Sequence, residues 1–264
     1  LIGGTGVVSA SGSATPGDLL YPVRLKVKEP VQLALTQSPE EKTGLEVAFA
    51  GERLKEFASA SSGGKLNTDT VALITDSLSE HLANAQDGIQ ELHEDGDTEI
   101  AIQTNADLHS LLSANQSILK KVGDVYPEAA SDIAVLSARV DEATLEAADT
   151  ADTLETSIEA SEVDGGAVDA QQEETTASLS SLREQIKNGL AALNEEDQKS
   201  VAEALLLVET LMSQGIAVEE AGDRTQAFIL YTEADAQLSS LRTLLTADQT
   251  LGIDLIDATS TPSF

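Results

Sequence analysis

Apolar residues recur at intervals of three and four positions along nearly all of this 264-residue chain. The stretch 71–92 is typical, and its apolar positions are Val71, Ile74, Leu78, Leu82, Ala85, Ile89 and Leu92. This spacing places the apolar side chains on one face of an α-helix, whereas the alternation expected of a strand is hard to find. The sequence therefore predicts an all-α fold.

Capping residues and helix breakers predict where the helices begin and end. Ser38 followed by Pro39 supplies an N-cap and a proline at the first helical position, and Asn194 and Asp223 are candidate N-caps. Asp164-Gly165-Gly166 is expected to interrupt the pattern. The first two predicted helices cover about 39–61 and 68–93, and a third ends before Pro127. Four more cover about 128–163, 168–193, 195–214 and 224–246. Short connections predict an antiparallel multi-helix bundle, with 128–163 as one long connecting helix.

The apolar content is 41%, enough for a core, but tryptophan is absent and only four Phe and three Tyr are present. We therefore expect closely spaced helices packed through Ala, Leu, Val and Ile. The absence of cysteine excludes a disulfide framework, a thiol nucleophile and thiolate metal sites. It does not exclude export.

The formal net charge of −31 argues against nucleic acid and anionic lipid as partners, because both would repel the chain. The charge is also uneven. Residues 122–180 hold fifteen acids and one base, Arg139, whereas Tyr21 to Lys65 hold seven of the fifteen bases. An acidic helical face is usually a solvated one, but it can also attract cations or a basic partner.

No motif in the chain predicts catalysis, cofactor binding or a metal site. The three histidines, His81, His93 and His109, form no zinc motif. Asp95 and Asp97 begin like a calcium loop, but Ile100 stands where that loop requires glycine. We therefore expect no catalytic residue, cofactor or dedicated metal site, and divalent cations remain only a weak possibility.

The first fifteen residues differ from the rest of the chain. Leu1 to Val8 are apolar, and Ser9 to Thr15 are small and uncharged. Eight apolar residues are too few to cross a bilayer, which takes roughly 20. Three interpretations stay open: the end of a membrane anchor, the end of a secretory signal, or an arbitrary boundary in a cytosolic protein. The first two predict an extracytoplasmic chain.

The sequence also predicts how the chain is divided. The segment 1–15 is followed by a helical domain at 16–126, a helical bundle at 127–246 and a tail at 247–264.

Residues Pro16-Gly17-Asp18-Leu19-Leu20-Tyr21-Pro22 combine turn formers with the first aromatic residue of the chain. Pro16 and Gly17 are expected to turn the chain and Asp18 to cap a short helix. Leu20, Tyr21 and Val23 would then dock this helix on the bundle.

This stretch, with Arg53-Leu54 further along, resembles an uncharacterised family of bacterial exported or membrane-anchored helical domains. In that family a Pro-Gly-Asp, Leu-Tyr-Pro, Val-Lys signature precedes an Arg-Leu-x-Glu helix, and here Arg24 stands for the usual lysine. The match is specific over 16–57 and looser to about 122. Some family members occur in anti-sigma-factor-like proteins. The resemblance implies an extracytoplasmic domain and no established activity. Its structural signature residues here are Pro16, Gly17, Asp18, Leu20, Tyr21, Pro22, Arg53 and Leu54.

Together these observations predict a noncatalytic extracytoplasmic scaffold or interaction module of a bacterial cell envelope, able to self-assemble at the cell surface. Its partner would be another protein or a second copy, and not nucleic acid. A membrane would be reached only through a segment before residue 1. The alternative is a membrane-tethered sensor ectodomain, similar to those of anti-sigma factors, that responds to a cation or envelope ligand through its acidic helices.

Overall fold

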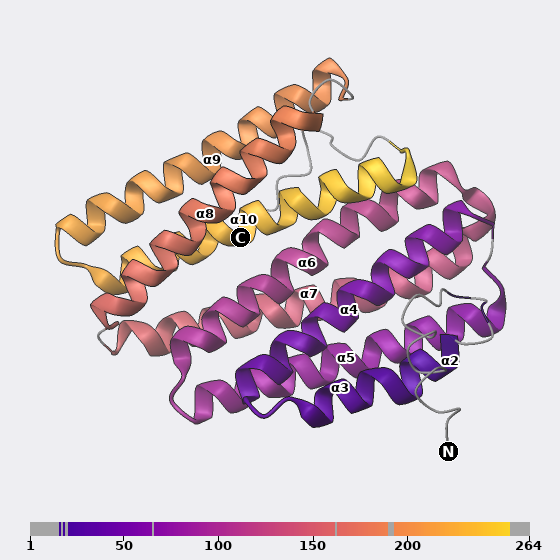
Figure 1. The fold of residues 1–264 in the computed structure, drawn as a ribbon, viewed down its shortest axis with the longest axis horizontal. Coiled ribbons are helices and arrows are strands. Elements are labelled where there is room, and N and C mark those ends of the chain that lie inside the picture. The colour runs from indigo at the N-terminus through magenta and orange to yellow at the C-terminus, as the bar shows by residue number, and fades with distance from the viewer. Residues whose placement is uncertain are drawn as a thin grey trace, which may run out of the picture.

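The computed structural model of this chain describes residues 16, 18, 21–64, 66–161, 163–189 and 193–253. Over these residues the protein is built of helices packed on one another, with no strand, so the all-α prediction is confirmed (Figure 1). The segment 1–15, the signature residues Gly17 and Leu20, and the tail from residue 254 lie outside the described part.

The long helices follow the predicted order. The elements are α2 (Tyr21–Val23), η2 (Arg24–Lys28), α3 (Glu29–Leu35), α4 (Pro39–Ser62), α5 (Thr68–Glu94), α6 (Thr98–Val125), η3 (Pro127–Ala129), α7 (Ala130–Glu159), α8 (Gly165–Gly189), α9 (Glu195–Glu220) and α10 (Arg224–Leu251). Three predicted N-caps accept hydrogen bonds as expected: Ser38 from the Glu41 N–H, Asn194 from the Asp197 N–H, and Asp223 from the Gln226 N–H.

Pro22 and Pro30 both lie within the N-terminal helical run without interrupting it. Residues 21–35 form one helical run in which Arg24–Lys28 is a π-helical turn, and the Glu29 N–H bonds to the Arg24 carbonyl. A proline lacks an N–H and crowds the carbonyl four residues earlier. The wider π turn accommodates Pro30 without ending the helix.

Three helix ends differ from the predictions. Gly165 and Gly166 begin α8 instead of breaking the chain, because the Asp164 carboxylate accepts a hydrogen bond from the Gly166 N–H (2.8 Å). Helix α9 continues through Gly215 to Glu220. Helix α10 continues to Leu251 and ends at Gly252, whose φ of 63° is a left-handed conformation that glycine adopts readily.

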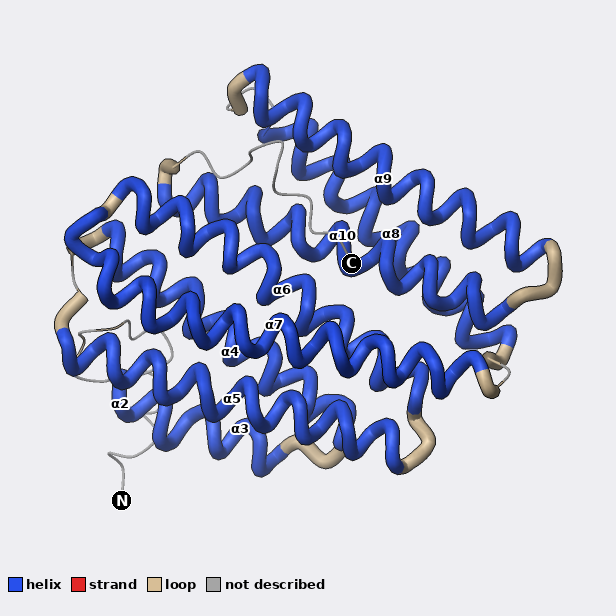
Figure 2. Tube along the Cα trace, turned by 180° about the vertical axis from the view of Figure 1, so that it is seen from behind, coloured by secondary structure: helices blue, strands red, loops and turns tan. Residues whose placement is uncertain are grey.

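The apolar side chains form two cores that share α10. The first core is drawn from α4, α5, α6 and α7, and the second from α8 and α9. The two cores divide α10 mainly along its length, with Ala227, Phe228, Tyr231 and Leu244 in the first core, and Ala234, Leu238, Leu241 and Leu245 in the second. Figures 1 and 2 show the consequence, since α8 and α9 lie together along one edge of the molecule.

Helix α7, at 30 residues, packs closely on α6 through small side chains. Ala143 and Ala147 are buried at this seam, and the Asn105 amide of α6 donates a hydrogen bond to the Ala147 carbonyl (2.9 Å). Residues on both sides of position 126 share the first core, for example Leu112 and Leu136. The division into domains at 126 and 127 stays a prediction.

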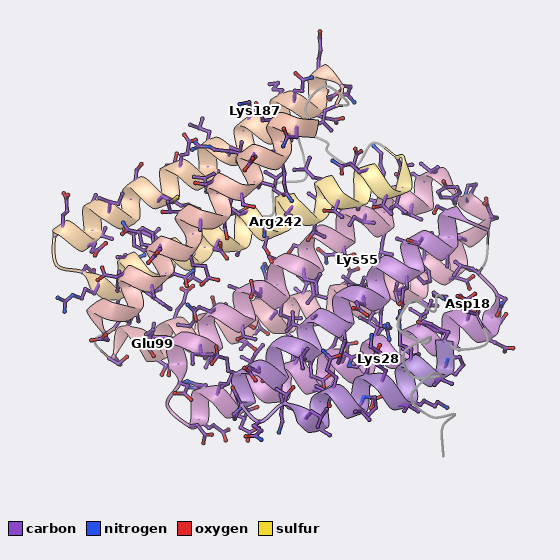
Figure 3. All side chains as sticks on the ribbon, in the orientation of Figure 1. Asp18, Lys28, Lys55, Glu99, Lys187 and Arg242 are labelled. Carbon is purple, nitrogen blue, oxygen red and sulfur yellow. The ribbon has the colours of Figure 1, made fainter. Side chains whose placement is uncertain are left out.

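Basic side chains follow the uneven distribution read from the sequence. Of those labelled in Figure 3, Lys28 and Lys55 lie in the N-terminal helices, whereas Lys187 and Arg242 lie in α8 and α10. Several bases near the N-terminus are not solvated surface charges. Arg53 is completely buried and Arg24 is nearly so, and a buried charge requires partners.

Candidate functional site

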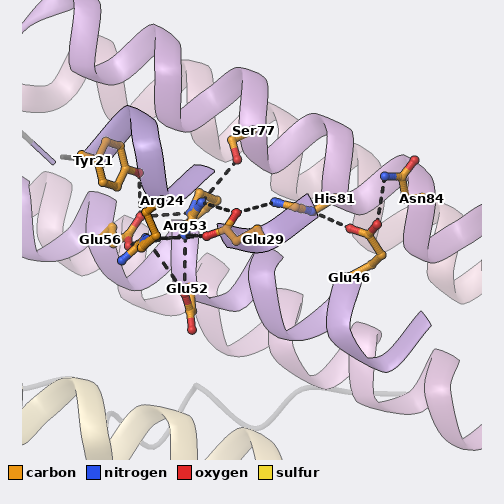
Figure 4. A network of polar contacts seen from close by, with 10 residues as sticks. All are labelled: Tyr21, Arg24, Glu29, Glu46, Glu52, Arg53, Glu56, Ser77, His81 and Asn84. Atoms are coloured by element: carbon orange, nitrogen blue, oxygen red, sulfur yellow. Dashed lines mark hydrogen bonds and ion pairs between the residues drawn. The ribbon is translucent and has the colours of Figure 1, made fainter. Parts of the chain in front are cut away.

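A network of polar side chains joins the N-terminal helical run to the bundle (Figure 4). It is assembled from three parts of the chain: the run at 21–35, helix α4 and helix α5. The ten members are Tyr21, Arg24, Glu29, Glu46, Glu52, Arg53, Glu56, Ser77, His81 and Asn84. Most are buried, although Glu52 stays half exposed.

Arg53 is the centre of this ion network. Its side chain has no exposed surface. The guanidinium contacts the Glu29 carboxylate (Nη2 to Oε1, 3.0 Å) and the Glu56 carboxylate (Nε to Oε2, 2.9 Å). It also donates a long hydrogen bond to the Ser77 hydroxyl at 3.4 Å. One α4 side chain thereby holds α3 and α5 together through charge-assisted hydrogen bonds.

The N-terminal run contributes a second cation and an aromatic ring. The Tyr21 hydroxyl donates to Glu56 Oε2 (2.6 Å). The Arg24 guanidinium forms an ion pair with Glu56 and lies 3.5 Å (Nε to Oε1) from Glu29. Both guanidiniums lie against the Tyr21 ring, Arg24 at 5.1 Å and Arg53 at 5.8 Å from its centroid, which adds cation–π attraction. The π turn between Arg24 and Glu29 allows both to reach α4.

His81 of α5 lies between two buried carboxylates. Its Nδ1 is 2.5 Å from Glu46 Oε2, and its Nε2 is 3.4 Å from Glu29 Oε2. Glu46 also accepts a hydrogen bond from the Asn84 amide (3.1 Å), and the Phe49 ring packs against the imidazole at 5.2 Å between centroids. An imidazole with a carboxylate at each nitrogen is favoured in its doubly protonated form.

The electrostatics of the network match this geometry. Burial opposes the charged form of Glu29, but the hydrogen bond from His81 and the Arg53 charge outweigh it and lower the Glu29 pKa. Burial likewise opposes the imidazolium of His81, but hydrogen bonds to Glu29 and Glu46 raise its pKa. The positively charged Arg24 and Arg53 and the imidazole of His81, whose protonated form is favoured, therefore lie against the carboxylates of Glu29, Glu46 and Glu56.

These shifts predict how stability depends on pH. The raised His81 pKa contributes stability that is complete below the unfolded value of 6.5 and is lost as pH rises through the folded value. The lowered Glu29 pKa contributes stability above its unfolded value of 4.5 that is lost as pH falls through its folded value. The contribution of the network should therefore be greatest between these limits.

We expect His81→Gln to lower the free energy of unfolding by about 1.5–3 kcal/mol near pH 6, because hydrogen bonds to charged groups are lost. The difference from the parent should shrink at higher pH, where the parent's own imidazole becomes neutral. Urea denaturation at pH 5.5 to 9 measures both quantities. His93→Gln, in the last turn of α5 and outside the ion network, is the matched control and should lower the free energy of unfolding by less than His81→Gln near pH 6. A parent-to-variant gap that stays constant across this range would contradict the assignment.

The predicted signature residues occupy several different environments. Pro16 is buried in a turn, Asp18 lies in an exposed bend, and the Asp18 carbonyl accepts from the Tyr21 N–H (3.1 Å). Tyr21 and Arg53 join the ion network. Pro22 is exposed, and Leu54 is fully buried in the first core. Gly17 and Leu20 lie outside the described residues.

Sequence reasoning assigned only Tyr21 and Arg53 as site residues and missed the other eight members, namely Arg24, Glu29, Glu46, Glu52, Glu56, Ser77, His81 and Asn84. A signal was present on two helices. His81 lies three residues after Leu78 and four before Ala85, on the apolar face of α5, and Arg53 is adjacent to Leu54 on the core face of α4. A charge at a core-facing position indicates a buried partner, but periodicity does not say which partner.

Carboxyls also gather in a hollow of about 330 Å³ between α4, α6, α8 and α10. Asp107, Glu174 and Asp235 line it, with Glu40 and Glu41. Burial, followed by the charges of Asp235 and Glu174, raises the pKa of Asp107 to about 7. Asp107 is exposed to solvent along the rim of this hollow, so water screens part of this effect.

A second hollow, of about 470 Å³, lies between α6, α7 and α10 and contains His109. Burial lowers the His109 pKa, so this imidazole is neutral at pH 7. His81 and His109 thus belong to different sites. Among the described residues, no three His, Asp or Glu side chains are arranged to hold a metal ion.

Comparison with known proteins gives one match. The family model described as a domain of unknown function (DUF5667) matches residues 13–237. Neither a curated protein nor a solved structure matches the chain.

Proposed function

This chain belongs to the DUF5667 family, a domain of unknown function, and we propose that it is a noncatalytic helical interaction module that works outside the cytoplasm at a bacterial cell envelope. In this role the helices present surfaces to a protein partner or to a second copy. The family assignment supplies no activity, so the proposal rests on the side chains.

The ion network carries the proposal. Catalytic acids and bases lie in clefts and have protons or lone pairs available to a substrate. Here Arg53, Glu29 and His81 are buried and engage one another. The hollows that contain His109 and the carboxyls of Asp107, Glu174 and Asp235 lie elsewhere in the bundle. The network is suited to fixing the N-terminal run rigidly on α4 and α5, which is what a module attached through that end requires.

Two observations support the location. Residues 16–57 resemble bacterial exported or membrane-anchored helical domains. In addition, one helix of the described residues, α9, has the length and apolar composition needed to cross a membrane, which is compatible with membrane anchoring. The core helix of a soluble protein passes the same test. Val201, Val208 and Leu211 of α9 pack in the second core, so in this fold the helix belongs to the bundle.

Light scattering on the purified chain tests the proposal, with and without residues 1–15. A mass that rises with protein concentration is expected of a self-assembling module. Loss of that rise on truncation would assign assembly to the N-terminal segment, and its persistence would assign assembly to the helical bundle. A monomer in every sample would contradict self-assembly.

The second candidate is a sensor, and the carboxyl-lined hollow favours it. Asp107, Glu174 and Asp235 repel one another across α6, α8 and α10, so a bound cation would relieve this repulsion and stabilise the packing. A sensor should show a large rise in Tm with millimolar Ca²⁺ that matched NaCl does not reproduce. An interaction module should respond equally to both salts.

A further inference from the structure

Helix α9 is the most unusual surface of this acidic protein. An 18-residue window of α9 is apolar enough to span a membrane, yet only 22% of that window is buried. Leu206 is 62% exposed and Ile216 is 42% exposed. The helix packs on α10 and α8 and lies at the edge of the molecule in both views (Figures 1 and 2). Exposed large apolar side chains on a helix of this apolar composition indicate a candidate interaction surface.

The outward stripe of α9 carries a charged residue between its ends, Glu209, which pairs with Arg183 of α8. We define the stripe by the exposed residues Ala202, Leu206, Thr210, Ser213 and Ala217, which recur at intervals of four, four, three and four. Its two hydroxyls already have partners, because Thr210 donates to the Leu206 carbonyl (2.7 Å) and Ser213 to the Glu209 carbonyl (2.8 Å). Burying them therefore leaves no donor unsatisfied. Small side chains also allow another helix to approach closely.

Charges of opposite sign lie at the two ends of this stripe. Lys199 lies near its start and Glu220 near its end, and both are exposed and 21 residues apart on the same helical face. An antiparallel copy of α9 would bring each lysine opposite the glutamate of the other chain. We propose that the outward stripe of α9 is the interface with a second copy of this chain, in a two-fold antiparallel arrangement. This inference deepens the proposed function, because it names the partner of the module.

The surroundings of the stripe fit this occupant better than a membrane. A helix that lies on a bilayer normally carries many Lys and Arg on its polar face, whereas α9 carries one base, Lys199, in a chain of net charge −31. At the centre of the two-fold arrangement the two copies of Glu209 come close together. Each is already paired with Arg183 of its own α8, which reduces the repulsion.

The size of the stripe predicts a weak dimer. A 26-residue helix is about 39 Å long and about 10 Å wide. One such face covers about 400 Å² per partner, half the roughly 800 Å² per partner of a standard interface. The dimer should therefore dissociate at low protein concentration and form as concentration rises.

Sedimentation velocity on the full chain at about 1 to 500 μM tests the proposal, in a range suited to weak association. The parent should show reversible dimerisation. Leu206→Glu should stay monomeric, and because Leu206 is already exposed, circular dichroism and Tm should be unchanged. The matched control is Leu145→Glu on α7, where leucine is 70% exposed, and it should dimerise like the parent.

A charge swap tests the antiparallel register. Lys199→Glu replaces two attractive contacts per dimer by repulsion and should weaken the dimer by about tenfold or more. Adding Glu220→Lys in the same chain should restore the affinity, since each new pair again has opposite signs. A double variant as weak as the single one would overturn the register.

Three further outcomes would overturn the inference. The first is a parent that stays monomeric up to the highest concentration. The second is a dimer that survives Leu206→Glu. This result would place the interface elsewhere on the chain, but self-assembly, and with it the proposed function, would stand. The third is flotation of the parent, but not of Leu206→Glu, with phosphatidylcholine vesicles, which would make a membrane the occupant.

Discussion

Replacing Arg53 with methionine is expected to lower the free energy of unfolding by about 3–5 kcal/mol, the usual cost of removing one partner from a buried ion pair. Arg53 is fully buried and neutralises Glu29 and Glu56. The variant would leave these carboxylates without their central cation, and methionine would fill most of the space without supplying a donor. Urea denaturation at pH 7 measures the loss.

Two comparisons separate the buried charge from a general effect of arginine removal. Arg139→Met removes an exposed pair with Glu142 and should cost at most about 1 kcal/mol. Glu29→Gln in the Arg53→Met background restores the charge balance, so the double variant should be more stable than the sum of the single losses predicts. Equal losses for Arg53→Met and Arg139→Met would refute the role given to the network.

Tyr231→Ala should be comparably destabilising, by about 3–5 kcal/mol, because a fully buried aromatic side chain is removed. The ring of Tyr231 lies where a side chain on Gly215 of α9 would have to go, with Cε1 only 2.5 Å from the Cβ position. The hydroxyl donates to Glu219 of α9 (3.0 Å) and accepts from Gln172 of α8 (2.9 Å). One α10 side chain thus holds α8 and α9 in place.

Tyr231→Phe separates the contribution of the ring from that of the hydroxyl, because it keeps the ring and removes only the hydroxyl. We expect a cost of about 1 kcal/mol, the ordinary contribution of a hydrogen bond. Burial, followed by the hydrogen bond to Glu219, raises the pKa of Tyr231 to about 12, so the phenol stays protonated. The difference in stability between the parent and Tyr231→Phe should therefore not change between pH 6 and 9. Thermal melts of both variants provide the test. A phenylalanine variant as unstable as the alanine variant would place the energy in the polar contacts instead of the packing.

The two positions differ in what they hold together. Arg53 fixes the N-terminal run on the first core, and Tyr231 fixes α8 and α9 on α10. The proposed interaction module would depend on both, because Arg53 fixes the N-terminal run on the bundle and Tyr231 fixes the orientation of α9, which carries the outward stripe. We therefore expect Tyr231→Ala to weaken dimerisation as well as stability.

The sequence by itself determined the helices. Periodicity and capping depend on residues within about four positions of each other, so Ser38, Asn194 and Asp223 marked the correct helix starts from local sequence alone. The errors have two different origins. The π turn at Arg24–Lys28 lies just before Pro30 and is a local feature, whereas Gly215 of α9 faces the Tyr231 ring of α10, a neighbour that the sequence pattern does not specify.

Only the tertiary structure decided which charges meet. Arg53 and Glu29 are 24 positions apart in the chain, and His81 and Glu46 are 35 apart, so their pairing follows from the packing of three separate helices. The same holds for α9, because its apolar sequence does not say that the fold places it at an edge of the molecule with Leu206 and Ile216 exposed. Local sequence fixes which face of a helix is apolar, whereas the arrangement of the other helices decides whether that face, or a charge within it, finds a partner.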